Sequence, residues 1–303
     1  MDDFTSGHIS TEESKEIICS LNSELASDSF QFFPGVSYRH LLVWRKGKYN
    51  LNTTPPHDII GKLIHEYLPT GEGSSEIIDL MKRSQEVLKN HPVNIKRIEA
   101  GAKPANSIWL WGQGRAPKIV KFTDQYHIKG GMISAVDLLN GIGIYAGLKI
   151  IHVDGATGYT DTNYLGKARQ ALSELQTMDF IFIHVEAPDE MGHEGNIDGK
   201  VRSIEDFDEK VVGTIVEGIR NLGSYRIMVL SDHPTPISLR THSLSPSPFA
   251  VLSSENDENL TLKLSFSESS AKKSGIFISP GHHLMEKYIS MRGWKSFVQE
   301  KRC

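Results

Sequence analysis

The sequence predicts an α/β fold in which helices cover both faces of a mostly parallel sheet, with a smaller α+β unit early in the chain. From about residue 107 onward, short apolar runs of the buried-strand type alternate with helical patterns, which is typical of a parallel sheet. Two of these runs, at residues 181–185 and 225–230, are followed at once by acidic residues and histidines. Open α/β sheets bind ligands at the carboxyl ends of their strands, so these two runs also mark the expected site.

Composition narrows the class of protein. The 303 residues are 39% hydrophobic and 23% charged, which is ordinary for a globular protein and allows one large domain or two. A formal net charge of -4 argues against nucleic acid or an anionic membrane as the main partner, although a local basic pocket for a small phosphorylated ligand is compatible with it. Two cysteines, Cys19 and Cys303, fit a reducing compartment. Because no apolar run reaches about 18 residues, we expect a cytoplasmic protein.

The first part of the chain has the pattern of a compact α+β unit. A capped helix at 11–25 and two strands at 30–33 and 38–44 are expected from the helix-start and turn residues around them. A second helix is expected after a Pro-Pro pair and ends near residue 67. A glycine-containing linker then leads to residue 73.

The rest of the chain alternates between helices and strands. We expect helices at 74–90, 134–145, 164–175, 201–222 and 284–288, and strands at 107–110, 149–153, 180–185, 225–230 and 249–253. The glycine-rich turn after the strand at 107–110, WGQGRAPK, resembles neither a Walker loop nor a dinucleotide fingerprint. Its glycines therefore indicate a turn without identifying a ligand.

The residues with metal-binding chemistry follow two strands. Asp189 and His193 lie four apart, so a helical turn or tight loop would place both side chains on one face. Asp232, His233 and His242 come after the next predicted strand along the chain. Read separately, Asp232-His233 is also compatible with an ordinary turn in which the aspartate caps the backbone. Because both clusters end apolar strands, we interpret them together as a metal site.

Other charged residues have two readings each. Arg39, Arg97 and Arg115 are able to clamp a phosphate, because a guanidinium matches phosphate oxygens in a bidentate way, but each alone is also an ordinary surface charge. Glu186 either fixes a metal-ligating imidazole or is a surface acid.

Five motifs carry a resemblance to a known family: HVEAPDEMGHEG, SDHPTP, RTHSLSPSPF, NSIWLWGQGRAP and DGATGYTDTNY. In this order they resemble the cofactor-independent phosphoglycerate mutases of the archaeal type, members of the alkaline phosphatase superfamily. The resemblance implies an alkaline phosphatase-like core, formed by residues 1–10 and 74–303, and a small inserted α+β lid domain at 11–73. It also implies two divalent metal ions, commonly manganese, zinc, cobalt or magnesium, and a phosphoserine intermediate.

The resemblance also assigns roles to individual residues. By motif, Asp189, His193 and His242 would hold one metal ion, and Asp232 and His233 would belong to the second. Contacts with the phosphate or carboxylate of phosphoglycerate would come from residues of the earlier part of the chain: His8 in the SGHIS motif, Arg39, Arg97 and Arg115.

One departure from the family pattern concerns the nucleophile. The family's N-terminal segment supplies an aspartate ligand and the nucleophilic serine, and no stretch of this sequence matches it. We therefore expect a truncated chain that lacks the N-terminal part of the core, has no mutase turnover and holds at most one metal ion well. Two other functions stay open, a homoserine kinase-like phosphotransferase of the same architecture and a non-catalytic remnant.

Overall fold

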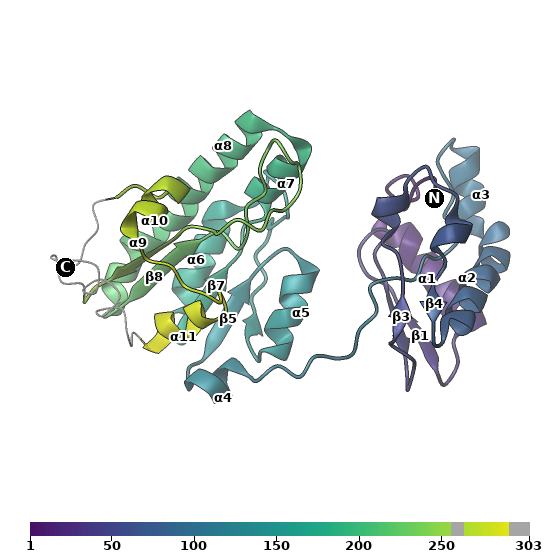
Figure 1. The fold of residues 1–303 in the computed structure, drawn as a ribbon, viewed down its shortest axis with the longest axis horizontal. Helices are drawn as coiled ribbons and strands as arrows, with labels where there is room; N and C mark the ends of the chain where they lie inside the picture. The colour runs from purple at the N-terminus through teal and green to yellow at the C-terminus, as the bar shows by residue number, and fades with distance from the viewer. Residues whose placement is uncertain (256–263, 291–303) are drawn as a thin grey trace. The chain divides into compact units, whose positions relative to one another are not determined.

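The computed structural model describes residues 1–255 and 264–290. It divides into two compact units, Met1–Ala116 and Pro117–Cys303 (Figure 1). Among the described residues, none of the helices has the length and apolar character that a membrane span requires.

The first unit packs helices against two short antiparallel strand pairs. Helix α1 (Thr11–Leu25) begins with a capping box, in which Ser10 and Glu13 satisfy each other's backbone amides. The other elements are β1 (Phe30–Phe33) paired with β2 (Leu41–Trp44), β3 (Leu51–Asn52) paired with β4 (Thr70–Gly71), α2 (Ser74–Lys89) and α3 (Pro92–Glu99).

Two predicted elements of this unit are different in the structure. The helix predicted up to residue 67 is replaced by two 3-10 turns, Pro56–Ile59 and Ile64–Tyr67. Gly61, with a φ of 76° between them, breaks the helical path. The predicted strand at 107–110 pairs with no other described segment. A side chain holds it instead, since the Ser84 hydroxyl accepts from the amide of Ile108 at 3.1 Å.

The first compact unit extends from Met1 to Ala116. The lid domain expected at 11–73 lies within it, together with residues 1–10 and the segment after residue 73. The reason is the apolar face of α2, since Leu80 and Leu88 share one buried core with Leu21 of α1 and Phe32 of β1. Burying these side chains ties α2 to the first unit.

The second unit is built on a three-stranded parallel sheet in the order β6-β5-β7 (Figure 1). Its elements are α4 (Phe122–Tyr126), β5 (Gly130–Ile133), α5 (Asp137–Tyr145), β6 (Lys149–Ile150), α6 (Tyr164–Glu174), β7 (Phe180–Ile183), α7 (Ala187–Glu194), α8 (Ile197–Asp206), a π-helical turn (Phe207–Gly213), α9 (Thr214–Ile219), β8 (Arg226–Leu230), β9 (Phe249–Ser253), α10 (Glu268–Ser274) and α11 (His283–Ser290). Strands β8 and β9 form a separate antiparallel pair. The described strands thus confirm a parallel sheet, though a small one.

Helices cover both faces of this sheet. Alternate residues of a strand point to opposite faces, and in β5 Ile133 packs with Ala168 and Ala171 of α6. Met132, on the other face, packs with Ala146 and with partly buried side chains of α4 and α5. Both faces are therefore buried, and the carboxyl ends of the strands are left to carry polar side chains.

Candidate metal centre

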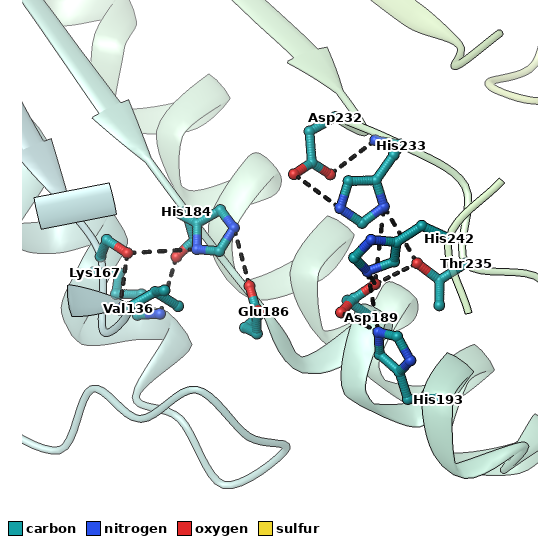
Figure 2. A network of polar contacts seen from close by, with 11 residues as sticks. Val136, Lys167, His184, Glu186, Asp189, His193, Asp232, His233, Thr235 and His242 are labelled. Atoms are coloured by element: carbon teal, nitrogen blue, oxygen red, sulfur yellow. Dashed lines mark hydrogen bonds and ion pairs between the residues drawn. The ribbon is translucent and has the colours of Figure 1, made fainter. Parts of the chain in front are cut away.

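Three predicted ligands converge in the second unit. Asp189 and His193 lie one turn apart on α7, the helix that follows β7, and His193 Nε2 is 3.1 Å from Asp189 Oδ2. His242, in the segment after β8, places its Nε2 3.5 Å from Asp189 Oδ1 and 3.1 Å from His193 Nε2. Each residue offers a ligand atom within 4.8 Å of the other two. Figure 2 shows the three side chains pointing toward one another. The predicted spacing thus brings Asp189 and His193 to one face.

The chemistry of these donors fits a divalent cation. His193 Nδ1 lies 3.1 Å from the carbonyl oxygen of Arg240, and a carbonyl only accepts, so Nδ1 carries the proton and Nε2 presents its lone pair to the cluster. Two imidazole nitrogens with one carboxylate suit manganese, zinc or cobalt. Asp189 keeps 21% of its side chain exposed, which leaves the site open to an entering ion.

Asp232 and His233 adjoin this cluster without completing it. The rings of His233 and His242 lie 3.8 Å apart, and His233 Nδ1 is 4.0 Å from Asp189 Oδ1. Asp232 contacts His233 Nε2 at 3.4 Å and is otherwise largely exposed. Among the described residues, the three-ligand set of Asp189, His193 and His242 is the one whose ligand atoms all lie within reach of one ion.

Thr235 is a site residue that the sequence reasoning missed. Thr235 is 4% exposed, and its hydroxyl donates to Asp189 Oδ1. The hydroxyl oxygen of Thr235 lies 3.3 Å from His233 Nδ1. The available signal was its place in the SDHPTP motif, two residues after His233.

A second polar group, made of Lys167, His184 and Glu186, lies at the carboxyl end of β7 (Figure 2). His184 Nε2 is 3.2 Å from Glu186 Oε2, so the imidazole that Glu186 holds belongs to His184 rather than to the three-ligand cluster. Fully buried Lys167 donates from Nζ to the carbonyl of His184 at 3.0 Å. Burial lowers the pKa of Lys167 to about 8. Burial, with Asp189 nearby, raises the pKa of Glu186.

The four predicted substrate contacts all lie in the first unit. Arg97 is buried and uses its guanidinium within the chain, contacting Glu13 at 2.7 Å and the carbonyls of Lys103 and Ser6 at 2.8 and 2.6 Å. This geometry favours a structural role for Arg97, because its donors already have partners.

The other three predicted contacts keep exposed side chains. Arg115 stacks 3.6 Å above the ring of Tyr49, and Arg39 lies 5.4 Å from the ring of Tyr38. His8, with a φ of 50°, lies in the turn that precedes α1. Each of them remains free to meet an anion from solvent.

Comparison with known proteins identifies the family. The family model described as the metalloenzyme superfamily matches residues 38–286. A probable 2,3-bisphosphoglycerate-independent phosphoglycerate mutase of Geobacter sulfurreducens is 51% identical over 289 residues, which are 95% of this chain and 72% of that protein. The 2,3-bisphosphoglycerate-independent phosphoglycerate mutase of Methanosarcina barkeri is 51% identical over 279 residues, covering 90% of this chain and 69% of that protein.

A solved structure supports the fold. The cofactor-independent phosphoglycerate mutase of Thermoplasma acidophilum aligns with a TM-score of 0.61 over 95% of this chain and 71% of that chain, at 19% identity. The resemblance carried by the sequence motifs is thereby confirmed. The chain belongs to the archaeal-type cofactor-independent phosphoglycerate mutases of the metalloenzyme superfamily.

Proposed function

We propose that this chain belongs to the machinery that interconverts 2-phosphoglycerate and 3-phosphoglycerate through a phosphoserine, with Asp189, His193 and His242 holding one divalent ion. The observation that carries this proposal is the convergence of these three side chains in a chain about half identical to proteins named as mutases. By motif, Asp232 and His233 contribute to a second ion. Manganese, zinc, cobalt and magnesium are the candidate ions.

Each residue of the metal centre has a separate role. A bound ion would supply charge neutralisation at the phosphoryl oxygens. Asp189 contributes the negative charge that holds the ion, and the imidazoles of His193 and His242 contribute neutral nitrogen donors. The carbonyl of Arg240, by accepting from His193 Nδ1, keeps the ring turned with Nε2 toward the ion.

The substrate contacts are proposed for the first unit. Arg39, Arg115 and His8 are exposed and suited to the phosphate or carboxylate of phosphoglycerate. Arg97, assigned to the same task by motif, would serve it by fixing the turn at Ser6 that precedes His8. Residues 11–73, which include Arg39, are proposed to act as the lid that closes over substrate.

We propose that the nucleophilic serine has no counterpart in this chain, and that the chain, assayed by itself, binds one ion well and does not turn over. The test is elemental analysis of the purified, metal-loaded chain together with a coupled assay on 3-phosphoglycerate. One ion per chain without isomerisation is expected. Isomerisation at a rate typical of the family would overturn the missing-serine proposal, and absence of stoichiometric metal would favour a non-catalytic remnant.

The names of the relatives favour the mutase over a homoserine kinase-like activity. A parallel assay with ATP and homoserine separates the two. Phosphorylation of homoserine by this chain would reverse the preference.

A further inference from the structure

We propose that Thr235 is a positioning residue that orients ligands in both halves of the metal centre, Asp189 in one and His233 in the other. The inference rests on the metal centre proposed above and names a residue outside its ligand set. Figure 2 shows Thr235 beside both side chains.

The Thr235 hydroxyl has one proton to donate and two neighbouring groups, Asp189 Oδ1 and His233 Nδ1. An ionised carboxylate only accepts, so the single hydroxyl proton goes to Asp189 Oδ1. The Thr235 oxygen is then left with lone pairs toward His233 Nδ1, 3.3 Å away. The imidazole of His233 is therefore held between Thr235 at Nδ1 and the Asp232 carboxylate, which lies 3.4 Å from Nε2.

The same hydroxyl also limits how the Asp189 carboxylate rotates. With Oδ1 bonded to Thr235, Oδ2 faces His193 Nε2 at 3.1 Å. Partners of this kind fix ligand orientation, and their loss typically weakens metal affinity by about 10- to 100-fold.

Thr235 is itself fixed by the helices that follow β7. Lys200 of α8 donates from Nζ to the Thr235 carbonyl at 2.6 Å. Gly192 of α7 allows the close approach, because a Cβ at that position would lie 2.6 Å from the same carbonyl oxygen and 2.9 Å from Thr235 Cγ2. Thr235 is thus held between the ligand-bearing helix and its neighbour, which gives its hydroxyl a defined position.

The test compares Thr235→Val, which keeps the shape and removes the hydroxyl, with Thr235→Ser, which keeps the hydroxyl. Calorimetric titration with Mn²⁺ is expected to show affinity about 10- to 100-fold weaker for the valine variant and near wild type for the serine variant. Thr162→Val is the matched control: Thr162 is also 4% exposed, and its hydroxyl accepts from the amide of Thr157 at 3.0 Å, away from the cluster. It is expected to bind Mn²⁺ as the wild type does.

A metal-free measurement tests the contact with His233 directly. Imidazole ¹⁵N NMR of the metal-free chain is expected to show a shifted His233 Nδ1 resonance in Thr235→Val, because the hydroxyl 3.3 Å from that nitrogen is gone. The resonance should stay unchanged in Thr162→Val. If Thr235→Val does not fold, Thr235→Ala removes the same hydroxyl without placing a second methyl against Asp189.

The outcomes separate this inference from the proposed metal centre. Equal Mn²⁺ affinity in the wild type and the hydroxyl-free variant, or an unchanged His233 Nδ1 resonance, overturns the role of Thr235. A wild-type chain that binds no Mn²⁺ overturns the metal centre itself, and the NMR measurement still decides whether Thr235 contacts His233 in solution.

Discussion

Lys167→Met is expected to change how the stability of the second unit depends on pH. Lys167 is fully buried beneath the end of β7, and burial lowers its pKa from 10.5 to about 8. The shift means that burial in the folded chain disfavours the charged form of Lys167, relative to the neutral form, by about 3 kcal/mol. Attraction to Glu186 already offsets part of the cost of burial.

The sign follows from proton binding. Below pH 8 the lysine is charged in both native and unfolded chains, so the native state bears the whole cost of the buried charge. Between about pH 8 and pH 10.5 the unfolded chain keeps the proton that the native chain has lost, and stability therefore rises with pH. The unfolding free energy of the wild type relative to Lys167→Met is expected to rise by up to about 3 kcal/mol across this window.

Urea unfolding followed by far-ultraviolet circular dichroism at pH 7, 8, 9 and 10 measures this difference. Lys129→Met, at an exposed lysine next to β5, is the matched control and should run parallel to the wild type. Parallel curves for the wild type and Lys167→Met would refute the reasoning, because they would mean that Lys167 titrates alike in folded and unfolded chains.

Three further predictions concern the scaffold. Arg97→Met removes the ion pair with Glu13 and the hydrogen bonds to the carbonyls of Lys103 and Ser6. It should cost the first unit about 1 to 3 kcal/mol in urea unfolding followed by tryptophan fluorescence, and an unchanged unfolding free energy would contradict its structural role. The pKa of Asp3 is lowered to about 2, chiefly by the Thr5 hydroxyl. The ionised Asp3 carboxylate therefore stabilises the folded chain, and this contribution to the unfolding free energy should disappear as pH falls from about 4 through about 2. Asp3→Asn should lack this acid-dependent loss. Gly131→Val places a Cβ 2.6 Å from Ile151 Cδ1 and should destabilise the second unit in thermal melts by about 1 to 3 kcal/mol, whereas an unchanged melting temperature would show that β5 has room to adjust.

The sequence predicted the strand-end location of the centre because the relevant signal is local. Asp189 and His193 lie four residues apart after an apolar strand, and residues at this spacing lie on the same face of a helix. His242 was also expected at the site from its place after the second strand. Its assignment to the same ion as Asp189 and His193 required the motif resemblance, since its approach to His193 spans 49 residues and depends on the path of the loop after β8.

What the sequence could not predict depends on burial and on tertiary contacts. Lys167 lies in a helical pattern where a lysine is ordinarily exposed, yet α6 turns it beneath β7, where it meets the His184 carbonyl. Thr235 has no pattern that distinguishes it from a turn residue, and its role arises from contacts with Asp189 and His233. The segment 107–110 has strand composition, but the hydroxyl of Ser84 instead of a neighbouring strand accepts from the backbone amide of Ile108, and the Trp109 indole donates to the carbonyl of Thr54.

The central claim is that this chain holds one divalent ion through Asp189, His193 and His242. Calorimetric titration of Mn²⁺ into the purified, metal-stripped chain tests it most directly, with Asp189→Asn and His193→Asn as variants that keep side-chain size and polarity. We predict one ion per wild-type chain and a loss of tight binding in both variants, because each removes one of the three convergent donors. Undiminished binding in Asp189→Asn, or no binding in the wild type, would contradict the claim.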